Sequence, residues 1–228
     1  SYSTYHRVVP RFIQLADSRD HRNYYIRGTY TNANLDFTED VRHLVELGFR
    51  EISLEPVVAL DGPFALGDEH VPMILQEYER LAEFYLASRR EGVPFNFFHF
   101  QVDLFSGPCL AKRLTGCGAG YEYLAVTPKG EIYPCHQFIG REGFLMGHVE
   151  EGGVDPSITR LFREAHLFNK EGCPDCWARY FCGGGCHANA HLFNGDIHKP
   201  HGGSRLLHKK RLECSFYIQS QLWEASQA

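Results

Sequence analysis

The chain has 228 residues, of which 43% are hydrophobic and 22% charged, a globular composition that suffices for one large or two small domains. Its formal net charge is −5, and its basic residues are scattered apart from one cluster at 205–211, which is interpreted as a solvated helix face. We therefore expect no nucleic-acid partner. No apolar run reaches the roughly 18 residues of a membrane-spanning helix, and the N-terminus lacks a signal-peptide pattern, so we expect a cytoplasmic protein without a membrane partner.

Strands and helices are predicted to alternate in the first half of the chain, beginning with a strand near the N-terminus. The first helix has Thr38 as its candidate N-cap and Gly48 as its end. The third strand is apolar enough to be covered on both faces. Together these elements predict a βαβαβ unit with a parallel sheet. The strands are expected at 23–31, 50–58 and 95–105, and the helices at 37–49 and 70–92.

The composition changes toward Gly and Cys near 105–109, where we place a domain boundary between residues 1–106 and 107–228. The second half is predicted to begin with a β-hairpin over 121–133. Asp155 before Pro156 is typical of a helix N-terminus, and that helix is expected to reach about residue 168. A last helix is expected over about 204–224.

All eight cysteines follow residue 108, and four of them crowd into the segment 173–186 as C-x2-C-x5-C-x3-C. An even count is compatible with four disulfides, but disulfides belong to oxidising compartments and chiefly to small domains with little core. Metal ligation is therefore the better interpretation. The cysteines are Cys109, Cys117, Cys135, Cys173, Cys176, Cys182, Cys186 and Cys214.

Two kinds of metal site fit these thiols. A C-x2-C loop turns the chain back on itself, Pro174 stiffens the turn, and the glycines at 183–185 let the backbone approach a bulky group. Eight thiolates would hold two zinc ions or two 4Fe-4S clusters. The spacing by itself leaves both open.

The full spacing, C-x12-G-x4-C over 117–135, then C-x2-C-x5-C-x3-C, then Cys214, resembles the seven-cysteine signature of the SPASM domain, which binds auxiliary clusters in many radical S-adenosylmethionine (SAM) enzymes. The segment 27–58 also resembles the later strands of the radical SAM barrel in maturases of SCIFF peptides. The resemblance implies an α/β fold, a partial parallel (β/α) barrel in 1–106, followed by a small α+β SPASM domain in 107–228.

The resemblance also implies which cysteines share a cluster. The first auxiliary 4Fe-4S cluster would take Cys109, Cys117, Cys135 and Cys186, and the second would take Cys173, Cys176, Cys182 and Cys214. In some members of the family one cluster keeps an open iron site, so Cys109 is either a ligand or free.

The C-x3-C-x2-C loop that binds the SAM-cleaving cluster of such enzymes is absent from this chain. We therefore expect the C-terminal part of a longer enzyme, which alone does not cleave SAM. The complete enzyme would bind SAM and a third 4Fe-4S cluster. Its expected partners are a precursor peptide, an electron donor such as ferredoxin or flavodoxin, and the missing N-terminal part.

The activity that the resemblance implies is formation of Cys-derived thioether crosslinks in a ribosomally made peptide. Two alternatives remain, a SPASM enzyme that installs a different peptide modification and a two-zinc structural or interaction module. No residue is assigned as catalytic. Polar residues at the carboxyl ends of the first two strands, where βα-barrel sites gather, are candidates for binding SAM or the peptide, namely Arg27, Thr29 and Glu55.

Other polar and aromatic residues are interpreted more plainly. His99 is expected to be a packed, hydrogen-bonded histidine. His187 and His191 lie four residues apart and are expected to have structural roles or to hydrogen-bond to a cluster. His136 follows Cys135, where sulfatase-maturing relatives have a catalytic Asp, which argues against their reaction. The aromatic residues Trp177, Tyr180 and Phe181 are expected to form a dry shell around a cluster.

Overall fold

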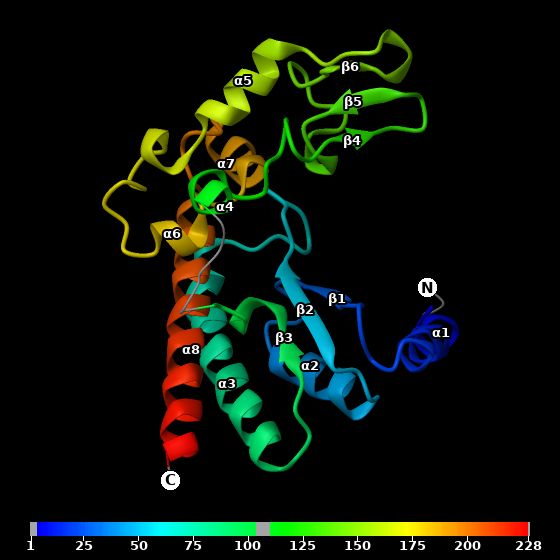
Figure 1. Ribbon diagram of the computed structural model, residues 1–228, viewed down its shortest axis with the longest axis vertical. Helices are drawn as coiled ribbons and strands as arrows, with labels where there is room; N and C mark the ends of the chain where they lie inside the picture. The colour runs from blue at the N-terminus through cyan, green and yellow to red at the C-terminus, as the bar shows by residue number, and fades with distance from the viewer. Residues whose placement is uncertain (1–3, 104–109, 228) are drawn as a thin grey trace. The chain divides into compact units, whose positions relative to one another are not determined.

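The computed structural model describes residues 4–103 and 110–227 (Figure 1). It is a mixed α/β fold that divides into two compact units, residues 1–102 together with 209–228, and residues 103–208. The division falls within the long helix α8 (Gly202–Gln227). In the part of the chain that the structure describes, no helix combines the length and apolarity needed to cross a bilayer.

The first unit contains a three-stranded parallel sheet in the order β1-β2-β3, which confirms the predicted βαβαβ unit. Helix α2 follows β1 in the chain and helix α3 follows β2. The elements are β1 (Ile26–Tyr30), α2 (Phe37–Glu46), β2 (Glu51–Pro56), the 3-10 turn η1 (Asp68–His70), α3 (Val71–Arg90) and β3 (Asn96–Phe97).

Two elements of this unit differ from the prediction. A helix, α1 (Tyr5–Ser18), precedes β1, whereas the strand was expected to be the first element. Its apolar residues Val8, Phe12 and Leu15 recur at helical spacing, the signal that the prediction overlooked. The third strand is only two residues long because the chain turns at η2 (Phe98–Phe100), which leaves Phe98 exposed between buried neighbours.

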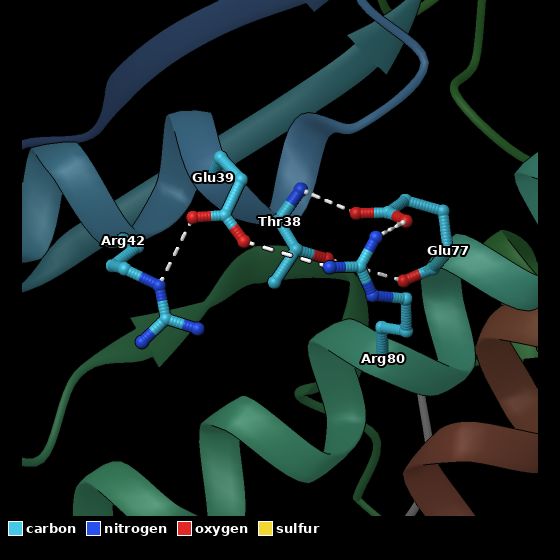
Figure 2. Close-up of polar contacts among 5 residues, drawn as sticks. All are labelled: Thr38, Glu39, Arg42, Glu77 and Arg80. Atoms are coloured by element: carbon cyan, nitrogen blue, oxygen red, sulfur yellow. Dashed lines mark hydrogen bonds and ion pairs between the residues drawn. The ribbon is translucent and has the colours of Figure 1, made fainter.

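Glu77 of α3, and not Thr38, supplies the cap of α2 (Figure 2). The backbone N–H of Thr38 donates to Glu77 Oε1 at 2.9 Å, and the Thr38 hydroxyl donates to the Glu77 carbonyl at 3.3 Å. Arg80 donates to Glu77 Oε2 at 3.0 Å and lies 3.6 Å from Glu39, which accepts from Arg42 at 3.2 Å. The predicted self-cap by Thr38 is therefore wrong, because a carboxylate from another helix satisfies the free amide.

The core of the first unit is aromatic. The rings of Tyr30 and Phe37 stack with centroids 4.5 Å apart, and Phe37 lies 5.0 Å from Tyr78 of α3. The C-terminal part of α8 lies alongside α3 (Figure 1), where Lys210 donates to Glu79 at 2.8 Å. Helix α8 therefore completes this unit, although it is distant in sequence.

The second unit contains a small antiparallel sheet in the order β4-β5-β6. The first two strands form the expected hairpin, but β4 has only two residues, and β6 was not predicted. Asp155 caps α5 through the backbone N–H of Ser157 at 2.7 Å, as expected, although the helix ends at Glu164. The elements are α4 (Leu110–Thr115), β4 (Ala125–Val126), β5 (Glu131–Tyr133), η3 (His136–Phe138), β6 (Gly147–His148), η4 (Val149–Glu151), α5 (Pro156–Glu164), η5 (Leu167–Asn169), α6 (Arg179–Cys182) and α7 (His187–Asn194).

Phenylalanines from η3, α5 and the loop before β6 meet in the core of the second unit. Phe138 lies 4.4 Å from Phe144 and 5.3 Å from Phe162, measured between ring centroids. Cys135 and Ala188 are buried in the same cluster. The cysteine-bearing segments are thus anchored on a conventional hydrophobic core.

Candidate functional site

The cysteine-rich segment 173–186 is a series of tight backbone turns. The N–H of Cys176 donates to the carbonyl of Cys173 at 3.1 Å, and α6 ends at Cys182. Three glycines follow with φ of 64°, 84° and 74° at Gly183, Gly184 and Gly185. Because positive φ strains any residue with a Cβ, this path needs glycine at all three positions.

Backbone amides converge on three of the thiols. Gly184 and Gly185 donate N–H groups to Cys182, and Ala188 and Asn189 donate to Cys186. The backbone N–H groups of Gln137 and Phe138 likewise donate to Cys135. Such bonds favour the thiolate over the thiol, and thiolates are the form that binds metals.

The electrostatic contacts sort six thiols into two sets of three. Burial raises the pKa of Cys135, and the thiolates of Cys186 and Cys117 raise it further. Burial likewise raises the pKa of Cys182, with added contributions from Cys173 and Cys176. We call Cys117, Cys135 and Cys186 the 135 triplet. We call Cys173, Cys176 and Cys182 the 182 triplet.

No disulfide links the seven cysteines that the structure describes, all of which are free thiols. Over residues 4–103 and 110–227, no three His, Cys, Asp or Glu side chains group closely enough to hold a single metal ion. A tetrahedral zinc site brings its sulfurs within about 4 Å of one another, given a Zn–S bond of about 2.3 Å. A 4Fe-4S cluster spreads its thiolates farther apart, because each cysteine binds a different iron. Cysteine thiolates are ligands for either kind of group.

Two cysteines are not assigned to either triplet. Cys109 lies outside the described residues. Cys214 belongs to the first unit, where it is 4% exposed and its thiol donates to the Tyr78 carbonyl at 3.5 Å. Burial raises its pKa to about 12. Its predicted role as a ligand remains a prediction.

The two histidines of α7 face the aromatic core. His187 is 2% exposed and stacks on Phe162 with centroids 5.4 Å apart, and His191 lies 4.7 Å from Phe144. Neither ring nitrogen of His187 has a hydrogen-bond partner among the described residues, and burial lowers its pKa to about 3. These packing contacts agree with a structural role for both residues.

The aromatic residues that are expected to form a dry shell around a cluster are partly exposed, and the shell stays a prediction. Trp177 is 50% exposed and Tyr180 is 39% exposed, while Phe181 is half-buried. His136 is exposed, and its Nδ1 lies 3.0 Å from the hydroxyl of Tyr123.

Residues at the strand ends of the first unit lie on one polar face of the sheet. Arg27 and Thr29 are exposed at alternate positions of β1, and Thr29 is in register with Glu55 of β2. The Glu55 carboxylate lies 2.8 Å from His99 Nε2 and accepts from Arg211 at 3.3 Å. The structure thus brings Glu55 and Thr29 together and adds partners that were not predicted.

Arg211 is the centre of this network and was missed because it lies in the basic cluster 205–211, which was interpreted as a solvated face. It is 7% exposed and donates to the Tyr78 hydroxyl at 2.8 Å. Burial by itself would raise the pKa of Glu55, but hydrogen bonds and charge from His99 and Arg211 outweigh it and lower the pKa to about 2. Burial and the Arg211 charge lower the pKa of His99. At neutral pH the site therefore holds an anionic Glu55, a neutral His99 and a cationic Arg211.

Known structures share this fold, while no protein-family model and no curated protein matches the sequence. His6-tagged anSMEcpe with bound AdoMet is 15% identical, with a TM-score of 0.68 over 93% of this chain. Native anSMEcpe with bound AdoMet and the Cp18Cys peptide is 16% identical, with a TM-score of 0.68 over 96% of this chain. The chain spans 57% and 62% of the lengths of these two proteins.

Streptococcus suis SuiB bound to S-adenosylmethionine is 18% identical, with a TM-score of 0.50 over 86% of this chain and 48% of its own. At these identities the similarity establishes the fold alone.

Proposed function

We propose that this chain is the auxiliary-cluster portion of a radical SAM enzyme that modifies a peptide, with Cys-derived thioether formation as its specific reaction. The observation that carries the proposal is the sorting of six thiols into two triplets. Each triplet consists of three of the four cysteines that the SPASM resemblance assigns to one cluster. Cys109 and Cys214 are proposed as the fourth ligands.

The chain's own residues perform three tasks in this proposal. The thiolates bind the two clusters, which when bound supply one-electron transfer to or from the reaction. The amides that follow Cys135, Cys182 and Cys186 donate to sulfur and stabilise its negative charge. The Glu55 carboxylate, held by His99 and Arg211, orients a donor group of SAM or of the peptide on the polar face of the sheet, together with Arg27 and Thr29.

A two-zinc module is the alternative, since zinc also binds sets of four cysteine thiolates. The full chain, purified without oxygen, should contain about eight irons and eight sulfides, since each 4Fe-4S cluster contains four of each. Two zinc ions per chain and a colourless sample would refute the proposal.

The reaction itself requires a longer enzyme with a SAM-cleaving site. Such an enzyme, co-expressed with its precursor peptide, should yield a product two hydrogens lighter per crosslink. Tandem mass spectrometry should locate each crosslink between a Cys sulfur and a carbon of another residue. A product with a different mass change would mean that the enzyme installs another kind of peptide modification. The proposal about the clusters would still hold.

A further inference from the structure

Lys170 is a buried lysine that contacts the cysteine-rich segment 173–186. It is 2% exposed and directly follows η5. Its ammonium donates to the Gly184 carbonyl at 2.9 Å and to the Gly185 carbonyl at 3.5 Å. Its own carbonyl accepts from the N–H of Cys173 at 3.2 Å. One residue thus contacts both ends of the cysteine-rich segment.

The glycine loop is shaped around this side chain. A Cβ at Gly184 would lie 2.9 Å from Lys170 Cδ and 3.3 Å from its Nζ, distances that leave no room for a methyl group. The same loop carries Cys182 at its start and Cys186 at its end. The ammonium is therefore held at a fixed place relative to one member of each triplet.

A buried ammonium is costly unless negative charge compensates it, and two neutral carbonyls do not provide a full charge. Burial lowers the pKa of Lys170, and thiolates from both triplets act against that change, Cys173 and Cys182 from one and Cys186 and Cys117 from the other. The cation therefore faces both predicted clusters from one position.

We propose that Lys170 is a positioning residue whose single buried charge raises the reduction potentials of both auxiliary clusters. This inference rests on the proposed function. A cluster becomes more negative when it gains an electron, so a fixed cation nearby stabilises the reduced form. Because the charge is shared, the two potentials should shift together.

The competing role is purely mechanical, with Lys170 acting as a clamp on the loop. Lys170→Gln retains a donor for the glycine carbonyls but removes the charge, whereas Lys170→Met removes both. Lys199→Met is the matched control, since Lys199 is an exposed lysine of the same unit. A clamp predicts that Lys170→Gln leaves both potentials unchanged.

The decisive measurement is a redox titration of the cluster-loaded full chain, followed by electron paramagnetic resonance, with iron content determined in parallel. The proposal predicts that both midpoint potentials fall in Lys170→Gln and in Lys170→Met, with no shift in Lys199→Met. Unchanged potentials at full iron content, or a shift of one cluster alone, would overturn it.

If Lys170→Gln and Lys170→Met both lose iron, Lys170→Arg tests whether the missing charge is the cause. Retention of iron in that variant supports a requirement for charge, and loss of iron refutes it. Absence of clusters in the unmodified chain would instead overturn the proposed function, and the inference with it. The two failures are therefore distinguishable.

Discussion

At the scale of single residues, the two triplets make the cluster assignment testable one thiol at a time. Cys135 interacts with Cys117 and Cys186, and Cys182 interacts with Cys173 and Cys176. Each of these two central cysteines should therefore affect one cluster only. The sequence spacing could not establish this, since Cys182 and Cys186 are four residues apart yet belong to different sets.

We expect Cys135→Ser and Cys182→Ser each to lower the iron content from about eight to about four per chain, because loss of a ligand releases one four-iron cluster. The double variant should contain almost none. Iron analysis with electron paramagnetic resonance checks this result. Loss of all iron in either single variant would contradict two separate sites.

The Glu55 network should give stability a specific dependence on pH. The carboxylate has a folded pKa of about 2 against an ordinary value of 4.5. Its contribution is therefore present above about pH 4.5 and is lost as the pH falls toward 2, and it amounts to no more than about 3 kcal/mol.

Glu55→Gln should consequently have a lower unfolding free energy than the unmodified chain at pH 7. This difference should shrink progressively below pH 4.5. Urea unfolding followed by circular dichroism, repeated across this range, measures the difference. Glu46→Gln, at an exposed position of α2, is the control. A difference that stays constant down to pH 2 would exclude the ion pairs as its source.

At the scale of elements, several boundaries depend on partners that are distant in sequence. Helix α2 begins where Glu77 of α3 accepts the N–H of Thr38. The hairpin over β4 and β5 has a third strand, β6, whose two residues give almost no sequence signal. Local patterns therefore predicted which elements exist better than where they begin and end.

Glu77→Ala should destabilise the first unit by about 1–3 kcal/mol, because it leaves a buried amide of α2 without an acceptor. Arg80→Ala should cost less, about 1 kcal/mol, since the Arg80 side chain is 60% exposed although the Glu77 side chain that it pairs with is 6% exposed. Chemical denaturation of the two variants tests the ranking. Equal losses would mean that the ion pairs, and not the cap, are important.

Gly120 and Gly140 separate steric clash from backbone strain in the second unit. Both have positive φ, 84° and 74°, but a Cβ at Gly120 would lie 2.7 Å from Phe162, whereas a Cβ at Gly140 meets nothing within 4 Å. We expect Gly120→Ala to cost about 3 kcal/mol and Gly140→Ala about 1 kcal/mol of unfolding free energy. Thermal unfolding of both variants measures these losses of stability. Equal losses would contradict a steric clash at Gly120.

At the scale of the whole molecule, the first unit presents an apolar helix face. Val8, Phe12 and Leu15 of α1 are 37%, 43% and 46% exposed. Contiguous exposed apolar surface promotes self-association in solution. An edge strand, β1, lies in the same unit and has a partner on one side only among the described strands.

The double variant Phe12→Glu with Leu15→Glu should therefore be more monodisperse than the unmodified chain at the same concentration. The matched control is Gln14→Glu with Ser18→Glu, which adds the same charge at other exposed positions of α1. Size-exclusion chromatography with light scattering provides the measurement. Equal improvement in both double variants would mean that added charge alone is responsible.

The sequence by itself predicted the parallel βαβαβ unit and the hairpin, because periodicity and turn residues are local properties. It did not predict that Arg211 and Lys170 are buried charges, since a lysine or arginine in a polar stretch is ordinarily solvated. Tertiary structure decided those two positions. In the folded chain, segments that are distant in sequence bring a carboxylate to Arg211 and thiolates to Lys170. These negative charges offset the cost of burying a cation.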